Sequence, residues 1–82
     1  MHRYIFHVDG QTDHFEMELP SIAAAKCEAV RYAGQLICAN AERFWDAAEF
    51  VLTVSDESRL ALFSLTLSGI EAPVIRGRLV QS

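Results

Sequence analysis

The chain has 82 residues, of which 51% are hydrophobic and 22% are charged, a balance that favours one small globular domain and excludes a disordered chain. The net charge is −4, and 7 basic residues are scattered among 11 acidic ones. This distribution argues against a surface that binds nucleic acid through clustered positive charge.

The first two predicted elements form a β-hairpin. Residues 3–8 and residues 14–19 each alternate apolar and polar side chains, which is the period of a half-buried strand. Asp9 and Gly10 lie between them and are a strong turn signal. The side of the hairpin expected to face the core carries Tyr4, Phe6, Val8, Phe15, Met17 and Leu19.

The opposite face of this hairpin carries His7, His14 and Glu16. Two imidazoles and a carboxylate are ligands that zinc accepts. However, these residues occupy adjacent strand positions, and no second group of ligands accompanies them. We therefore interpret them as a polar cluster on a hairpin face, with His7 opposite either Glu16 or His14 according to the register. The sequence predicts no metal site and no cofactor.

A long helix follows the hairpin. Pro20 ends the second strand, and Ser21 is a suitable N-cap. The alanine-rich segment predicts a helix over about residues 21–40, with Trp45 as its farthest end. Its apolar arc spans roughly 200°, whereas a single core face needs about 100°. One stripe of this arc contains Ile22, Ala29, Ala33, Leu36, Ile37 and Phe44, and a stripe of small residues contains Ala23, Cys27, Val30, Gly34, Cys38 and Ala41.

The wide arc has two interpretations, which are a helix sunk deep in its own domain and a helix that packs both on its sheet and on a partner. The two cysteines, Cys27 and Cys38, lie on this helix, about 16 Å apart along its axis. A disulfide requires Cα atoms within about 7 Å, so we expect both thiols to be free. Phe44 and Trp45 are expected to close the end of the core rather than to form an exposed recognition patch.

A second hairpin is predicted from residues 49–55 and 59–67, joined by a turn at 56–58. Its core side is expected to carry Phe50, Leu52, Val54, Ala61, Phe63, Leu65 and Leu67. Ile5 falls on the other, mixed face of the sheet. The order ββαββ predicts an α+β fold of two layers, in which one main helix packs on one face of an antiparallel sheet. Residues 1–67 then form the domain, and residues 68–82 form a C-terminal strand or arm.

Three segments of the chain resemble a family of small bacterial proteins that is a domain of unknown function. The segments are RYIFHVDG at 3–10, MELPSIAAAKCEA at 17–29 and LTVSDESRLALFSL at 52–65. Two positions depart from the family pattern, because Ile5 replaces an aromatic residue and the turn SDESR lacks a glycine. The resemblance implies the fold and a bacterial cytosolic setting, and it supplies no catalytic or binding residues. The hairpin–helix–strand order is also similar, more loosely, to antitoxin-type domains.

The sequence contains no arrangement typical of an enzyme, since no nucleophile is paired with a base and no catalytic motif occurs. We therefore predict a non-enzymatic module that forms a homodimer and binds protein. The candidate dimer contacts are the helix around Val30, Gly34 and Ala41, the open sheet face, and an exchanged C-terminal arm. The alternative is a nucleic-acid-linked regulator, in which a dimer displays Arg76 and Arg78.

The expected location is the cytoplasm. The chain has no run of about 18 or more apolar residues that would span a membrane, and the apolar run at its start is too short for a signal peptide.

Overall fold

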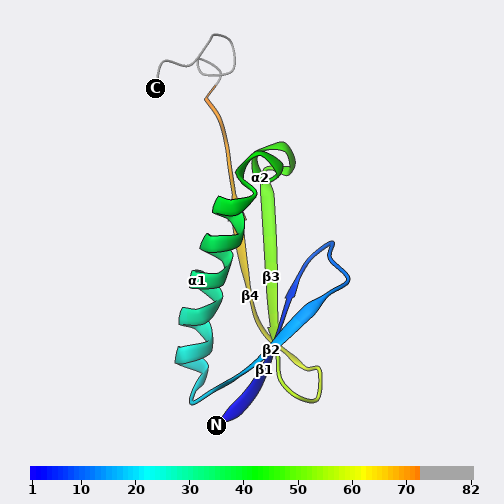
Figure 1. Cartoon of the computed structure of the whole chain (residues 1–82), viewed down its shortest axis with the longest axis vertical. Coiled ribbons are helices and arrows are strands. Elements are labelled where there is room, and N and C mark those ends of the chain that lie inside the picture. Colours follow the sequence, from blue (N-terminus) through cyan, green and yellow to red (C-terminus); the bar gives the residue numbers. More distant parts are fainter. Residues whose placement is uncertain (73–82) are drawn as a thin grey trace.

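The alternating residues at the start of the chain form an antiparallel hairpin of β1 (His2–Val8) and β2 (His14–Leu19), as predicted. The structure is a computed structural model that describes residues 1–72 (Figure 1). Phe6 lies opposite Phe15, and His7 lies opposite His14, which is the tighter of the two registers considered. Gly10 has φ of 90° in the connecting turn, a conformation that glycine adopts without strain.

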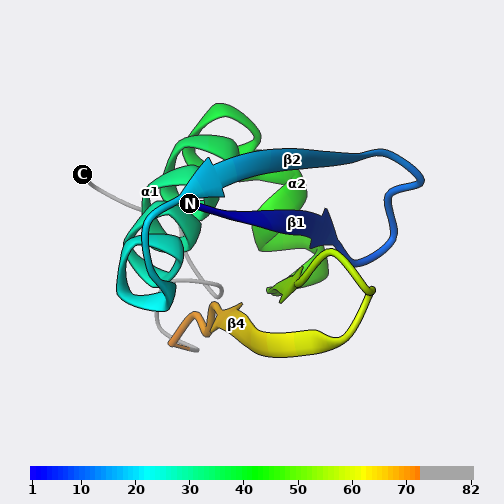
Figure 2. The same ribbon diagram turned by 90° about the horizontal axis from the view of Figure 1, so that it is seen from below.

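Four strands make one antiparallel sheet in the order β2-β1-β3-β4, with β3 spanning Glu49–Ser55 and β4 spanning Ala61–Ser68. Strand β1 therefore pairs with β2 of its own hairpin and with β3 of the second hairpin, while β2 and β4 are the two edges of the sheet (Figure 2). The strand or arm expected within residues 68–82 falls largely outside the described part of the chain.

Two helices connect the hairpins, α1 (Ile22–Ala39) and α2 (Ala41–Ala47). Ser21 caps α1, because its side-chain oxygen accepts from the backbone N–H of Ala24 at 3.2 Å. The helix predicted over about residues 21–40 is confirmed as α1, whereas its continuation to Trp45 is interrupted at Asn40, and residues 41–47 form the separate helix α2. The side-chain amide of Asn40 donates to the carbonyl of Leu36 at 3.0 Å, which satisfies a group that the helix end leaves free.

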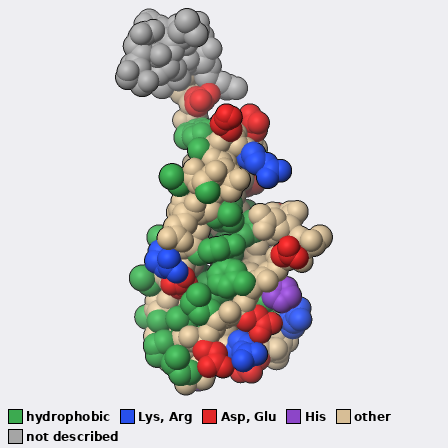
Figure 3. Space-filling model, viewed as in Figure 1, with side chains coloured by type: hydrophobic (Ala, Val, Ile, Leu, Met, Phe, Trp, Pro, Cys, Tyr) green, Lys and Arg blue, Asp and Glu red, His purple; other side chains and the backbone are tan. Residues whose placement is uncertain are grey.

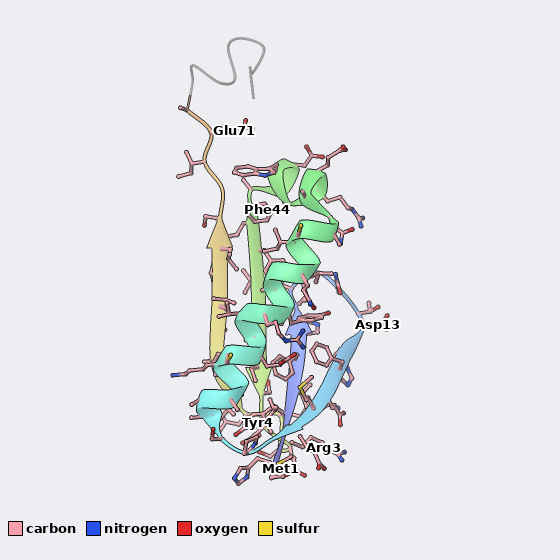
Figure 4. The ribbon with its side chains drawn as sticks, turned by 60° about the vertical axis from the view of Figure 1, so that its left-hand side comes forward. Met1, Arg3, Tyr4, Asp13, Phe44 and Glu71 are labelled. Carbon is pink, nitrogen blue, oxygen red and sulfur yellow. The ribbon has the colours of Figure 1, made fainter. Side chains whose placement is uncertain are left out.

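The core lies where α1 crosses the centre of the sheet. Three alanines of the helix, Ala25, Ala29 and Ala33, are at most 1% exposed, and they share a cluster with the fully buried side chains of Phe6, Leu52 and Val54. Alanine at i, i+4 and i+8 gives a flat stripe, so the helix approaches the strands closely. The α+β fold with its long helix on one sheet face is confirmed (Figure 4).

Two details of the predicted faces are corrected by the structure. Ala61 was expected on the core side, but a β-bulge between Val54 and Ser55 places it opposite Ser55, and it is exposed. Ile22 was assigned to the buried stripe of the helix and is 45% exposed, because it lies in the first turn. Ile5 lies on the outer face, as predicted, and is only 7% exposed there, with Glu16 as its cross-strand partner.

The turn between β3 and β4 depends on Asp56. Its carboxylate accepts from the N–H and hydroxyl of Ser58 at 2.9 and 2.8 Å and from the N–H of Leu60 at 3.0 Å. These hydrogen bonds, that of the Ser58 hydroxyl first, hold the pKa of Asp56 below its ordinary value. Arg59 has φ of 71° in this turn, a left-handed conformation that favours glycine, and the turn segment SDESR contains no glycine.

We expect Phe6→Ala to lower the free energy of unfolding by about 3–5 kcal/mol. Phe6 is 1% exposed and stacks on Phe15 with ring centroids 4.8 Å apart. His7→Ala, one position along on the opposite face, is the control and should cost less than about 1 kcal/mol. Urea denaturation measures both, and equal losses would contradict the assignment of faces in β1.

We expect Ala48→Gly to stabilise the protein by up to about 1 kcal/mol. Ala48 ends α2 with φ of 62°, a left-handed conformation in which its Cβ is strained. The control is Ala47→Gly, one residue earlier and inside the helix, which should destabilise by about 0.5–1 kcal/mol. Opposite shifts of the melting temperature are the expected result, and two losses of similar size would argue against strain at Ala48.

Candidate functional site

The polar cluster predicted on the first hairpin is present as a surface feature. The ring of His7 is turned towards the turn, where its Nε2–H donates to the carbonyl of Gln11 at 2.8 Å. The Nε2 of His14 lies 3.6 Å from a carboxylate oxygen of Glu16. His7 and His14 are cross-strand partners, but each ring has a different neighbour. The register therefore brings the three residues to one face without pointing them at a common centre.

On the same face, Arg3 of β1 forms ion pairs with two glutamates of the edge strand β2. Its guanidinium donates to Glu16 at 3.3 Å and to Glu18 at 3.2 Å. The hydrogen bond to Glu18, followed by the charge of Glu16, raises the pKa of Arg3 above its ordinary value. Charged and histidine side chains gather accordingly at the lower right of Figure 3. Glu16 is thus engaged by a cation already, and the cluster is a network of exposed ion pairs.

No group of three or more His, Cys, Asp or Glu residues able to hold a metal ion occurs within residues 1–72. An open hollow of about 280 Å³ lies between the first turn, the end of α1 and α2, and Gln11, Asn40 and Arg43 are among its lining residues. No polar or charged residue of the described chain is buried. The hollow therefore offers no desolvated side chain of the kind that positions a substrate.

The predicted dimer contact on the helix is accessible. Val30 is 60% exposed, and Gly34 lies in α1 with open space where a Cβ would be. Ala41 is exposed too but belongs to α2, since the helix breaks at Asn40. Cys27 and Cys38 are exposed as well. Figure 3 shows hydrophobic side chains in a band along α1. The small-residue stripe thus faces outwards, away from the alanine stripe that packs on the sheet.

The edge strand β4 is a second apolar surface, in addition to the exposed side of α1. No charged residue occurs between Arg59 and Glu71. Phe63, Leu65 and Leu67 face the core side but remain half-buried. Figure 4 shows why, since α1 runs diagonally and leaves the C-terminal part of β4 beside it rather than beneath it. The absence of charge was visible in the sequence, whereas the position of this strand at an edge was not.

Phe44 and Trp45 were expected to close the end of the core rather than to form an exposed patch, and the structure shows features of both roles. Phe44 is half-buried, and its ring meets that of Trp45 edge-on at 5.4 Å. Trp45 is 49% exposed and covers the backbone of Gly69, where a side chain would collide with the indole. Gly69 also donates its N–H to the carbonyl of Ala48 at 3.0 Å. The pair therefore closes the end of the sheet, and the indole remains partly accessible.

Comparison with known proteins identifies a family but no function. The family model described as Domain of unknown function (DUF6894) matches residues 3–68. Neither the curated proteins nor the solved structures contain a match. Among residues 1–72, no helix has the length and apolar character needed to cross a membrane.

We expect both cysteines to react with a thiol reagent in the native protein, because Cys27 and Cys38 are free and exposed. The measurement is a count of reactive thiols without denaturant and without reductant, and the expected result is two per chain. The single variants Cys27→Ser and Cys38→Ser should each leave one. A disulfide within one chain, seen as a monomer with no free thiol until it is reduced, would contradict the helix geometry.

Proposed function

The chain belongs to the family Domain of unknown function (DUF6894), and from this premise we propose that it is a small non-enzymatic module that self-associates and binds protein. The observation that carries the proposal is apolar surface left uncovered by a very small core. The buried hydrophobic residues are Tyr4, Ile5, Phe6, Val8, Ala25, Ala29, Ala33, Leu52 and Val54.

The size of this core supports association because a domain of about 80 residues has little stability to spare. Three of the buried residues are alanines of α1, which contribute little apolar area. Meanwhile Val30 and Leu60 are 60% and 63% exposed, and Trp45 is 49% exposed. A second copy that covered part of this surface would add buried apolar area to both chains.

The polar residues support a non-enzymatic role. Catalytic side chains work in clefts where burial and neighbouring charges shift their pKa values. In the described chain the histidines and carboxylates of the first hairpin stand on its outer, solvent-facing side. The pKa values of Arg3 and Arg31 are raised and that of Asp56 is lowered. Their causes are surface ion pairs for the two arginines and a turn for Asp56. These interactions stabilise local structure, and among residues 1–72 we infer for them no role as a catalytic acid or base.

The rival function is a dimeric regulator that contacts nucleic acid through Arg76 and Arg78. Both arginines lie outside the described residues, and no basic cluster is formed by the described ones. A mobility-shift assay with DNA or RNA distinguishes this regulator from the protein-binding module. A salt-dependent mobility shift of DNA or RNA favours the regulator, because contacts with phosphate release counterions.

We expect sedimentation equilibrium at tens of micromolar to give twice the chain mass of 9.2 kDa. The physical reason is the burial of the apolar surface described above, so the dimer should persist in high salt. The control is the same measurement at submicromolar concentration, where dissociation should appear. A chain that remains monomeric at tens of micromolar would contradict self-association, and the apolar surface would then need a different protein to cover it.

A further inference from the structure

The free edge of β4 exposes a regular set of backbone hydrogen-bonding groups. Gly69 donates to Ala48, so these two residues form a hydrogen-bonded pair of the β3–β4 ladder. Hydrogen-bonded and non-hydrogen-bonded pairs alternate along antiparallel strands. Phe63, Leu65 and Leu67 therefore use their backbone groups towards β3. The N–H and C=O groups directed away from the sheet belong to Ser64, Thr66 and Ser68.

The two edges of the sheet differ in their protection. On β2, His14, Glu16 and Glu18 stand in ion pairs with one another or with Arg3, and charge on an edge strand discourages further pairing. The residues of β4 and those next to it, from Leu60 to Ile70, carry no charge and include no proline. A long, uncharged edge with apolar residues on one face is the kind that pairs with another strand.

The chain itself does not cover this edge as far as Ala72. Figure 1 shows the residues after Ser68 continuing beyond the end of β4 instead of turning back along it. Within residues 1–72, β4 therefore pairs only with β3, and its other edge is open.

A second copy of β4 fits the edge by its own pattern. We infer that two chains pair β4 with β4 in antiparallel orientation, which joins their sheets into one of eight strands. The inference deepens the proposed self-association by naming its surface. With the two-fold axis at Leu65, Phe63 lies beside Leu67 of the second copy, and Ser64 and Thr66 form hydrogen-bonded pairs across the axis. Apolar residues then meet apolar ones on one face, and hydroxyl residues meet on the other.

This pairing also places the helices. A two-fold axis perpendicular to the sheet leaves both α1 helices on the same face of the joined sheet. The half-buried side chains of Phe63, Leu65 and Leu67 from both copies then form a continuous strip between the helices. Val30 lies on the side of α1 nearer to β4, because Lys26, four positions earlier, lies over the ring of Phe63 at 5.9 Å. The exposed valine therefore borders the strip.

The test is Thr66→Pro in the full chain. Proline removes the N–H of residue 66, which points away from β3, and prolines are tolerated on edge strands when that group faces outwards. Two pairing hydrogen bonds are lost per dimer, so the apparent dissociation constant should rise about tenfold or more. The matched control is Thr66→Val, which keeps the N–H and should remain dimeric. Circular dichroism and thermal melting establish that both variants are folded.

A measurement on the unaltered protein guards against misfolding of the proline variant. Hydrogen exchange should show the amides of Ser64 and Thr66 protected in the dimer and exposed on dilution to the monomer. Protection of these amides in a monomer would instead assign the edge to the chain's own C-terminal residues and overturn the inference. A dimer whose β4 amides exchange freely, and which Gly34→Glu rather than Thr66→Pro dissociates, would overturn it in favour of the helix. In that last case self-association itself would stand, whereas a monomer at all concentrations would refute both.

Discussion

The close contact between the alanine stripe of α1 and the two central strands is the constraint on which the rest of the structure depends. Ala25, Ala29 and Ala33 are almost fully buried against β1 and β3. Small side chains bring the helix axis near the sheet, and the large side chains of the strands fill the remaining space. One consequence is that part of the sheet stays uncovered, because one narrow helix that crosses a four-stranded sheet diagonally cannot cover both edge strands.

The two edges respond to this incomplete coverage in different ways. Beside β2, the ring of Tyr32 meets Phe15 edge-on at 4.5 Å, and the outer face is occupied by ion pairs of Arg3. Beside β4, Lys26 over Phe63 is the corresponding contact, and Leu65 and Leu67 stay half-buried. The sheet is therefore sealed by aromatic packing and charge on one side and left open on the other. This asymmetry supports the proposed pairing of β4 with a second copy.

The first hairpin shows that residues of the types that bind metal can share one face without forming a common site. His7, His14 and Glu16 do reach one face, since strand alternation alone puts them there. Whether they form a centre depends on side-chain direction, and the nearest partners decide that direction. His7 donates a hydrogen bond to the backbone carbonyl of Gln11 in the turn, while His14 and Arg3 both lie against the carboxylate of Glu16. The resulting surface stabilises the hairpin and protects its edge.

The sequence by itself determined the strands, the long helix and the α+β class, because alternation, an N-cap and an alanine-rich run are local signals. It also placed Phe6, Leu52 and Val54 in the core and the small-residue stripe on a separate side of the helix. The bulge that turns Ala61 outwards was decided by the tertiary structure, since it depends on the partner strand β3. The left-handed backbone at Ala48 and Arg59 is a strained conformation that residue type does not indicate. The open edge is the clearest case. The uncharged run after Arg59 is plain in the sequence, yet only the strand order, with β1 between the two hairpins, makes β4 an edge and gives that run a surface to present.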